Sequence, residues 1–401
     1  MPYQFCSFFT HQSFLVLLSS PSIRFLFLFL LLTFLQNKNW ILIMSKTQTM
    51  KALVMEAKHN VQYRDITVPD ELGPDDCRVR IHSVGICGSD VHYVEHGGIG
   101  DFIVKEPMIL GHEASGTVTA VGSKVRHLKV GDRVALEPGI PRWTSPQTLQ
   151  GLYNVDPDVV FFATPPVHGC TRISVIHPAA LCFKLPAEMS FAEGAMCEPL
   201  SCGLWAVMKA KVQPGQVALV LGAGTIGLCT ALSALASGCS EVIIADLDKS
   251  RLQFAKQFPH LHPVNSANKE SVLATVRRLT ADGGVNCIFE CTGAAAAYSL
   301  IYPCAAPGAT CVITGMPPAP VPLNVVAAQA KEITFMTTFR YRNTYPSAIQ
   351  LIRSGRVNVK PLISATYPIE KGMDAYKRAL ERRQGDVKII IQVDNSNSTK
   401  L

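Results

Sequence analysis

Three residues in two glycine-flanked segments carry the side chains of a working metal site. Cys87 lies in Gly85-Ile86-Cys87-Gly88-Ser89-Asp90, and His112 and Glu113 lie in Gly111-His112-Glu113. A structural zinc is normally closed by four thiolate or imidazole ligands, whereas a catalytic zinc has three protein ligands of mixed type and one open position. A thiolate, an imidazole and a carboxylate match the second kind. The sequence therefore predicts a catalytic zinc.

The distribution of cysteines limits the metal content and the compartment. The chain has thirteen cysteines, an odd number, scattered mostly through apolar stretches, which is typical of reduced core residues in an intracellular protein. We therefore expect a cytoplasmic protein without disulfides. Between Cys87 and Cys170 there is no cysteine, so that span cannot hold a four-thiolate zinc. One metal per chain is expected.

Each ligand taken alone has an ordinary structural explanation. Cys87 would serve as a small buried hydrophobe, His112 as a hydrogen-bonded core histidine and Glu113 as a surface acid. A fourth candidate is Glu198 in Glu198-Pro199-Leu200, at the point where the β-rich pattern gives way to a second pattern. Active sites favour such clefts between domains, although an acid that caps a helix would fit there equally well.

A glycine turn after an apolar strand indicates a dinucleotide site. Gly222, Gly224 and Gly227 form a GxGxxG turn, together with Thr225 and Ile226, after the strand-like segment 217–221. The glycines let the backbone approach a pyrophosphate, and the following helix N-terminus supplies free N–H groups. A turn without a ligand is the alternative.

An acid about twenty positions beyond the turn selects the cofactor. Asp246 ends the segment 241–246, where a carboxylate accepts hydrogen bonds from both hydroxyls of an adenosine ribose and repels a 2′-phosphate. NAD is therefore favoured over NADP. Arg251 could lie near the adenine, which keeps use of both cofactors open.

The order of strand and helix patterns predicts an α/β chain with two domains. From Lys51 to about Pro199, short β-type runs are separated by turn residues, as in a compact, mostly β domain. After Pro199, strands alternate with helices, which implies a doubly wound parallel sheet with right-handed crossovers. The strands expected there are 217–221, 241–246, 285–290, 309–315 and 333–339, and the helices include 250–258 and 269–279. Helices 345–353 and 371–383 and a strand 387–393 follow, and this last segment is expected to return to the first domain.

The chain ends and the charge balance bear on partners and location. Residues 1–43 form a leader with an apolar run of eleven residues, 25–35, which is too short to span a membrane. We interpret the leader as an upstream extension of the reading frame, with a membrane anchor as the alternative. The tail 398–401 approaches a peroxisomal address but reads as a polar tail. A net charge of +7 without a dense basic run argues against nucleic-acid binding.

The motifs together resemble a known enzyme family. The chain is similar to the zinc-containing medium-chain dehydrogenases, and within them to the polyol branch that includes sorbitol and xylitol dehydrogenases. The resemblance covers about Met50 to Val393. It rests on the two ligand segments, on the glycine turn with Asp246, and on Glu137-Pro138-Gly139-Ile140-Pro141, Ala163-Thr164-Pro165-Pro166, Glu198-Pro199-Leu200-Ser201 and Phe339-Arg340-Tyr341-Arg342-Asn343-Thr344.

This resemblance implies an architecture and a set of roles. It implies a GroES-like catalytic domain in two segments, 44–199 and 339–401, a Rossmann domain at 200–338, and a homotetramer. It assigns Cys87, His112 and Glu113 to the zinc, and places Glu198 next to the metal, either as a ligand or through a bound water. Ser89 and His92 match a proton relay, although a histidine packed under the cofactor is as good an interpretation of His92. Residues that match polyol-contacting or pocket positions are Tyr93, Phe161, Thr164, Glu198, Arg340 and Tyr341; an interdomain ion pair is the alternative for Arg340.

Two segments depart from the family pattern. Many relatives hold a second, structural zinc with a cysteine cluster in the lobe that corresponds to 143–158, and this chain has no cysteine there. The lobe is therefore expected to hold its shape by packing alone. The segment 169–174 also differs from the branch pattern, which puts substrate contacts from that wall in doubt.

The expected activity is oxidation of a secondary alcohol of a sugar alcohol to a ketose, with NAD accepting hydride. Xylitol is the first candidate substrate and sorbitol the second, by resemblance alone. Competing hypotheses are another zinc alcohol or L-threonine dehydrogenase, a zinc-free reductase and a dinucleotide-binding protein without activity. The last two have no need of the Cys87, His112 and Glu113 trio.

Overall fold

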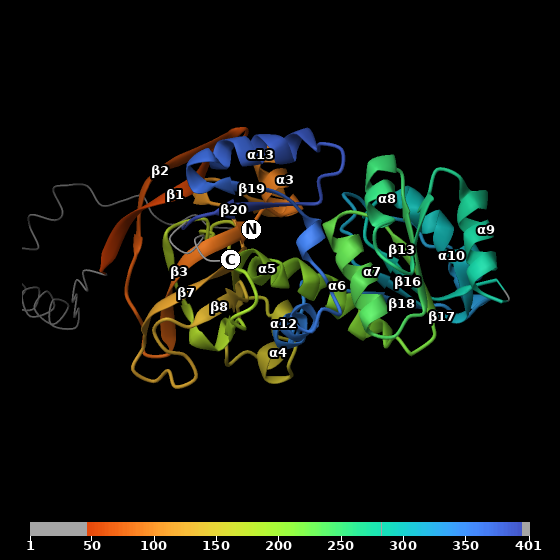
Figure 1. Cartoon of the computed structure of the whole chain (residues 1–401), viewed down its shortest axis with the longest axis horizontal. Coiled ribbons are helices and arrows are strands. Elements are labelled where there is room, and N and C mark those ends of the chain that lie inside the picture. Colours follow the sequence, from red (N-terminus) through yellow and green to blue (C-terminus); the bar gives the residue numbers. More distant parts are fainter. Residues whose placement is uncertain (1–45, 282, 395–401) are drawn as a thin grey trace, which may run out of the picture. The chain divides into compact units, whose positions relative to one another are not determined.

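Two large β-sheets organise residues 46–281 and 283–394, the part of the chain that the computed structural model describes (Figure 1). The leader 1–43 and the tail 398–401 lie outside the described residues, so the hypotheses about them stay predictions. Among the described residues, no helix is both long and apolar enough to cross a membrane.

The first sheet is mixed and carries the metal-ligand segments. Its strand order is β12-β8-β7-β3-β20-β19, and β11 also pairs with β3. All pairs are antiparallel except β19 with β20. The strands are β3 (Asp76–Gly85), β7 (Glu113–Val121), β8 (Arg133–Leu136), β11 (Ser174–Pro178), β12 (Cys182–Lys184), β19 (Ile363–Pro368) and β20 (Lys388–Gln392).

The last strand of the described chain pairs with one of the first. β20 runs antiparallel to β3, with Ile390 opposite Gly85, so the C-terminal segment lies directly beside the Cys87 segment. Three smaller sheets surround this one. Their strands are β1 (Thr47–Ala57), β2 (Asn60–Pro69) and β6 (Met108–Ile109); β4 (Gly98–Ile99) and β5 (Phe102–Ile103); and β9 (Gly139–Ile140) and β10 (Val160–Phe161).

The second sheet is fully parallel, as the alternating strand and helix patterns predict. Its order, β15-β14-β13-β16-β17-β18, is that of a doubly wound dinucleotide-binding sheet. The strands are β13 (Val217–Leu221), β14 (Glu241–Asp246), β15 (Leu261–Asn265), β16 (Val285–Glu290), β17 (Ala305–Ile313) and β18 (Thr334–Thr337).

Most predicted elements are confirmed, and one strand of the parallel sheet was missed. The predicted bounds of β13, β14 and β16 match the structure, while β17 starts earlier and β18 is shorter than predicted. The strand β15 was not predicted, because Pro263 and the polar His262 interrupt its pattern. Proline is tolerated here because β15 is an edge strand, where one side of the backbone needs no ladder partner.

Helices cover the parallel sheet and join it to the first sheet. In Figure 1, α6 lies between the two sheets, and α6, α7 and α12 share one hydrophobic core with strands of both. The predicted helices at 269–279 and 345–353 match α9 and α12. The helices are α3 (Gly88–His96), α4 (Pro146–Leu149), α5 (Phe191–Ala195), α6 (Cys197–Ala210), α7 (Thr225–Ala236), α8 (Lys249–Ala255), α9 (Lys269–Leu279), α10 (Ile301–Cys304), α11 (Val325–Gln329), α12 (Tyr345–Arg353) and α13 (Gly372–Glu381), with 3₁₀ turns η1 (Tyr153–Val155), η2 (Ala179–Leu181), η3 (Ala295–Leu300), η4 (Lys360–Leu362) and η5 (Ile369–Lys371).

The lobe at 143–158 is held by polar contacts, which corrects the expectation that packing alone shapes it. The buried Asp156 accepts hydrogen bonds from the backbone N–H groups of Arg142 (2.6 Å) and Asp158 (3.1 Å). Ser145 caps α4 by accepting a hydrogen bond from the N–H of Thr148 at 3.1 Å. One carboxylate thus holds two turns of the lobe together. It does so because backbone N–H groups that are removed from water need a hydrogen-bond acceptor.

Candidate catalytic metal centre and dinucleotide cleft

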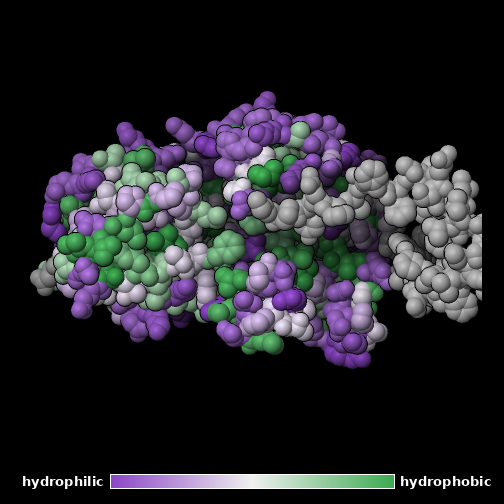
Figure 2. Space-filling view, turned by 180° about the vertical axis from the view of Figure 1, so that it is seen from behind, coloured by the Kyte–Doolittle hydropathy of each residue, from purple (hydrophilic) through white to green (hydrophobic). Residues whose placement is uncertain are grey.

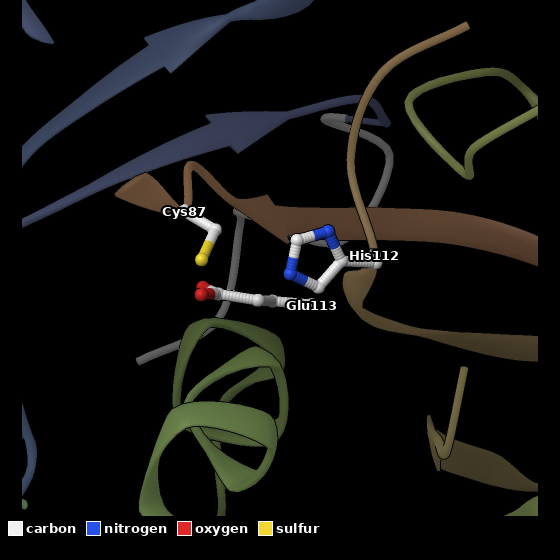
Figure 3. Close-up of side chains that lie close together, drawn as sticks. All are labelled: Cys87, His112 and Glu113. Carbon is white, nitrogen blue, oxygen red and sulfur yellow. The ribbon is translucent and has the colours of Figure 1, made fainter. Parts of the chain in front are cut away.

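The three predicted metal ligands lie together, as Figure 3 shows. One ligand atom from each of Cys87, His112 and Glu113 lies within 4.8 Å of the others, and this is the candidate metal group found in the described part of the chain. Cys87 is half-buried and precedes α3, whereas His112 and Glu113 are buried at the start of β7. A sulfur, a nitrogen and an oxygen donor thus converge from two segments that run side by side.

Asp90 fixes this arrangement and was not among the predicted site residues. Its fully buried carboxylate accepts hydrogen bonds from the N–H of Cys87 (3.0 Å) and of Gly111 (3.1 Å), and it lies 3.7 Å from His112 Nδ1. A carboxylate behind a metal-binding histidine orients the ring and leaves the other nitrogen for the ion. Its signal in the sequence is an acid three residues after Cys87, in the same motif.

The protonation of this pair follows from burial and charge. Burial alone would lower the pKa of His112, but the nearby Asp90 carboxylate and Cys87 raise it well above its usual value. Burial opposes ionisation of Asp90, yet its contacts with His112 and with backbone N–H groups hold its pKa below the usual value. Both effects favour the charged forms of His112 and Asp90 in the metal-free chain.

Glu113 fits beside β3 only because its neighbour has no side chain. Gly85 lies opposite Glu113 in the β3–β7 ladder, and a Cβ at Gly85 would lie 1.9 Å from Glu113 Oε2. Lys388, at the start of β20, donates to both carboxylate oxygens of Glu113, at 2.6 and 2.7 Å. Lys388 was also missed; its signal is the one charged residue in the otherwise apolar start of a strand, Lys388-Ile389-Ile390-Ile391.

Glu198 lies near the trio but outside the ligand group. It is buried in the first turn of α6, and its Oε1 accepts a hydrogen bond from the Tyr341 hydroxyl at 2.9 Å. Burial, together with the charge of Glu113, raises the pKa of Glu198 to about 7. The side chain of Glu198 is hydrogen-bonded to Tyr341, and α6 has no side-chain cap, so Glu198 does not serve as a helix cap. Contact with the metal through a bound water stays a prediction.

A wall of the predicted pocket residues extends from the metal ligands. The centroid of the Phe161 ring lies 5.6 Å from that of the His112 ring, and the Arg340 guanidinium stacks over the Phe161 ring at 3.8 Å from its centroid. Thr164 lies beside the Tyr93 hydroxyl, and Tyr93 is close to Arg340.

One polar atom in this wall has no partner. Nη1 of Arg340 is buried without a hydrogen-bond acceptor among the described residues, and burial lowers the pKa of Arg340 to about 10. A buried donor without an acceptor is costly, and a ligand oxygen would satisfy it. Tyr341, in contrast, is buried with its hydroxyl on Glu198.

The glycine turn has the geometry of a dinucleotide site. It joins β13 to α7, and a Cβ at Gly227 would lie 1.9 Å from the carbonyl oxygen of Gly222, so the helix can begin this close to the strand only with glycine. Asp246 ends the neighbouring strand and accepts a hydrogen bond from the N–H of Ala223 at 2.6 Å. Arg251 Nη1 lies 3.7 Å from Asp246.

Two adjoining cavities connect this turn to the metal ligands. A cavity of about 690 Å³ is lined by Gly222, Asp246 and Arg251 among others. A second, of about 370 Å³, is lined by Cys87 and His92 on one side and by the glycine turn on the other. Both include Gly224, Arg251 and Cys291, so they form one cleft from the acid at the end of β14 to the half-buried thiol. An extended dinucleotide could follow this cleft with its reactive end at the metal.

Comparisons with known proteins agree with this geometry. Residues 73–187 match the alcohol dehydrogenase GroES-like domain, and residues 225–354 match the zinc-binding dehydrogenase family. A D-xylulose reductase of Morganella morganii is 54% identical over 83% of this chain and 98% of its own length. The sorbitol dehydrogenase of Rattus norvegicus is 42% identical over 86% of this chain and 96% of its own length. The chain belongs to the polyol branch of the zinc-containing medium-chain alcohol dehydrogenases. The structure of 2R,3R-butanediol dehydrogenase from Bacillus subtilis has the same fold, with a TM-score of 0.78 and 28% identity over 86% of this chain and all of that one.

As a medium-chain dehydrogenase, this chain is an oxidoreductase that acts on a CH–OH group and takes zinc and a nicotinamide cofactor. The residues present fit the metal, because a buried imidazole, a buried carboxylate and an accessible thiol form a mixed donor set with one open side. Bound zinc would supply Lewis acidity toward a substrate oxygen.

The predicted relay residues of this dehydrogenase lie on α3, directly after Cys87. His92 is exposed, lines the cleft beside Cys87, and packs against His96 with the two rings tilted by 59° and their centroids 4.4 Å apart. Ser89 is half-buried in the first turn of the same helix. A proton path from the metal to solvent through these two side chains stays a prediction. Because His92 is exposed, it could form the end of that path that meets solvent.

The divergent segment 169–174 of this dehydrogenase supports the metal site from behind. The N–H groups of Gly169 and Cys170 donate to the carbonyl oxygens of Ile109 (2.7 Å) and Gly111 (2.9 Å). The segment therefore fixes the loop that carries His112. The hydrogen bonds thus give the segment a role in holding this backbone, and its contact with substrate stays a prediction.

Proposed function

We propose that this chain is an NAD-dependent, zinc-containing polyol dehydrogenase that interconverts a sugar alcohol and a ketose, with xylitol and D-xylulose as the first candidate pair and sorbitol and fructose as the second. The observation that carries the proposal is the unpaired Nη1 of Arg340, held one aromatic ring away from the metal ligands. A simple alcohol offers nothing to this donor, whereas a polyol brings further hydroxyl oxygens. The names of the two relatives support the same substrate class.

The chain's own residues would orient the substrate and move its proton. Phe161 holds the Arg340 guanidinium in place by stacking, so the donor is already oriented when a substrate hydroxyl arrives. The Tyr93 hydroxyl and Thr164 offer further hydrogen bonds on the same wall. The substrate proton would leave through Ser89 and His92 to solvent, because His92 is exposed at the cleft.

Substrate specificity can be tested with two arginine variants. We expect the wild-type chain with zinc to oxidise xylitol, sorbitol and L-arabinitol faster than ethanol and L-threonine in initial-rate measurements. R340M should raise KM for xylitol about tenfold or more, the scale of a lost charged hydrogen bond, and leave the slow ethanol rate unchanged. R342M is the control, because Arg342 stacks on Trp205 and not on the pocket wall. Equal rates with ethanol and xylitol, or full activity in zinc-free protein, would contradict the proposal.

NAD is the proposed cofactor because a carboxylate closes the adenosine end of the cleft. Asp246 has a side chain only 11% exposed, and a 2′-phosphate beside it would meet a second negative charge. Arg251 Nη1 lies 3.7 Å from this carboxylate. In D246S, the ratio of kcat/KM for NADP to that for NAD should rise about tenfold or more, because the repulsion is removed and Arg251 is freed. A preference for NADP in the wild-type chain would refute the assignment.

A homotetramer in the cytoplasm is the proposed form of the enzyme. β18 is the outer strand of the parallel sheet, and exposed hydrophobic side chains, Leu323, Val325 and Val326, lie close to it in sequence. Figure 2 shows hydrophobic side chains gathered on this end of the molecule. Exposed apolar patches of this kind mark association surfaces. The cysteines of the described residues are free, which supports a reducing compartment. Sedimentation equilibrium measures the assembly, and a monomer at micromolar concentration would contradict this part of the proposal.

A further inference from the structure

Lys388 is a buried cation whose hydrogen bonds all go to the metal site. Its Nζ donates to the carbonyl oxygen of Ile86 at 2.9 Å and to the two carboxylate oxygens of Glu113 at 2.6 and 2.7 Å. The residue is only 3% exposed. An ammonium group has three donors, so all three are used. Burial would lower the pKa of Lys388, but the charges of Glu113 and Cys87 more than offset it, and its pKa is raised.

Glu113, the residue that binds Lys388, is also the carboxylate of the candidate metal-ligand group. Glu113 is 1% exposed, and one of its oxygens lies within 4.8 Å of the ligand atoms of both Cys87 and His112. Both of its oxygens are already hydrogen-bonded to the ammonium group. A divalent ion among the three ligands must therefore share this carboxylate with Lys388 or displace it. It must also accept a second cation close by, in an interior where charges are poorly screened.

The backbone around Lys388 keeps the ammonium group from withdrawing far. Ile389 accepts a hydrogen bond from the N–H of Ile86 at 2.9 Å, and Ile390 pairs with Gly85 in the ladder of β3 and β20. On the other side, the Val387 carbonyl oxygen accepts a hydrogen bond from the Thr225 hydroxyl at 2.6 Å, in the first turn of the dinucleotide-binding helix α7. Lys388 is thus fixed by contacts with both the metal segment and the cofactor segment.

We propose that Lys388 is a positioning residue that competes with the metal for Glu113. Before metal binds, it holds the buried carboxylate in place and balances its charge. After metal binds, it draws on the same oxygens and repels the ion, so the affinity for zinc is lower than the three ligands alone would give. The inference rests on the proposed function only in requiring that zinc binds to Cys87, His112 and Glu113.

Zinc affinity of the full chain tests the inference without measuring activity. Metal-free wild type, K388M, K388Q and K388R are titrated with zinc against a fluorescent chelator, and thermal midpoints are recorded with and without zinc. K388M and K388Q should bind zinc at least about tenfold more tightly than the wild type. Removing a residue that supports a metal ligand typically weakens metal binding by about tenfold or more, so the expected effect has a similar size and the opposite direction. Their metal-free forms should melt at lower temperature, because Glu113 is left buried and unpaired. K388Q keeps hydrogen-bond donors and is the variant to use where K388M does not fold.

Matched variants separate this effect from a general loss of structure. K388R keeps the charge and should bind zinc as the wild type does. K331M removes another lysine whose Nζ binds two carbonyl oxygens, those of Tyr302 and Ala305, away from the metal ligands, and should leave zinc affinity unchanged. In an E113Q background, K388M should raise zinc affinity much less than it does in the wild-type background, because only direct repulsion between Lys388 and the ion remains to be removed.

Three results would overturn the inference. Unchanged or weaker zinc binding by both K388M and K388Q, while the wild type binds zinc, would refute the competition and leave the proposed function intact. A gain in zinc affinity from K388M that is equally large in the E113Q background would show that Lys388 does not act through Glu113. Failure of the wild type to bind zinc at Cys87 would refute the proposed function as well, and C87S identifies that case.

Discussion

His112 and Glu113 are adjacent in the chain, yet both reach one metal position. In a strand, consecutive side chains point to opposite faces. β7 begins only at Glu113, and His112 belongs to the loop before it, where the N–H of Gly111 is bonded to Asp90. The Asp90 carboxylate thus anchors the backbone directly before His112 and lies 3.7 Å from its Nδ1. The function of the pair depends on the place where the strand starts.

The thiol of Cys87 should be required for zinc but not for folding. In C87S, a hydroxyl replaces a thiolate, which is the softest of the three donors and the one that binds zinc most strongly. Zinc content per chain by elemental analysis should fall to near zero after dialysis, and xylitol oxidation should be lost. C239S is the control, because Cys239 is buried in the core beside α6 and α7, away from the ligand group. Retention of one zinc per chain in C87S would contradict the assignment.

Glu137 should make stability depend on pH. Burial raises the pKa of Glu137 to about 7 in the folded chain, while Tyr153 donates a hydrogen bond to it at 2.6 Å. Between the unfolded value near 4.5 and the folded value, the folded state binds a proton that the unfolded state does not. Stability therefore falls as pH rises from about 4.5 to 7, by at most about 3 kcal/mol from this group.

The variant E137Q removes this titration. In urea unfolding of metal-free protein at several pH values, its free energy of unfolding should decline less than that of the wild type between pH 5 and 7, and it should be the more stable protein above pH 7. E381Q, which changes a surface acid paired with Arg383, is the control. Parallel curves for E137Q and wild type would show that Glu137 is ionised in the folded chain throughout.

At the scale of elements, the lobe at 143–158 shows how one carboxylate can hold several turns together. Asp156 accepts hydrogen bonds from two backbone N–H groups. These bonds, together with its contacts with the hydroxyls of Ser145 and Thr148, hold the pKa of Asp156 below its usual value. The two short helices of the lobe, α4 and η1, have no large core of their own, since neither buries more than Asn154. Hydrogen bonds to a single acceptor therefore define the path of the chain.

D156A should loosen this lobe while the remaining fold persists. The loss of the acceptor leaves two backbone donors unpaired, so we expect faster hydrogen exchange confined to residues 142–158 and a lower thermal midpoint. D158A is the matched control, because Asp158 makes only an exposed ion pair with Arg142. Unchanged exchange in the lobe of D156A would show that packing suffices.

At the scale of the whole molecule, segments far apart in the chain meet at the candidate metal site. The ligands come from the end of β3 and the start of β7, and the partner of Glu113 comes from β20. The core that joins α6, α7 and α12 connects this region to the parallel sheet. Metal binding therefore bears on the stability of the chain as a whole.

Removal of zinc should lower the thermal midpoint of the intact protein. A ligand that binds only the folded state stabilises it by an amount that grows with the logarithm of its free concentration. Scanning calorimetry with excess chelator and with graded free zinc should give a midpoint that rises steadily by a few degrees across the series. C87S should show one midpoint under all these conditions. A wild-type thermal midpoint that does not change with the free zinc concentration would indicate that zinc does not bind the folded chain.

The sequence by itself predicted the fold class, most strands and helices, the grouping of Cys87, His112 and Glu113, and the glycine turn. These follow from local signals: alternating and helical hydrophobic periods, glycines where backbone must approach backbone, and donor types at short spacing. It missed β15, where Pro263 hides an edge strand.

Only the tertiary structure decided which distant residues complete the site. Lys388 lies 275 positions from Glu113, and Arg340 approaches Phe161 from another segment. Asp90 and Asp156 accept hydrogen bonds from backbone N–H groups, and such bonds cannot be predicted from the spacing of residue types in the sequence. The physical reason is that a local pattern reports the periodicity of one segment, whereas the pairing of buried charges and donors depends on which segments the folded chain brings into contact.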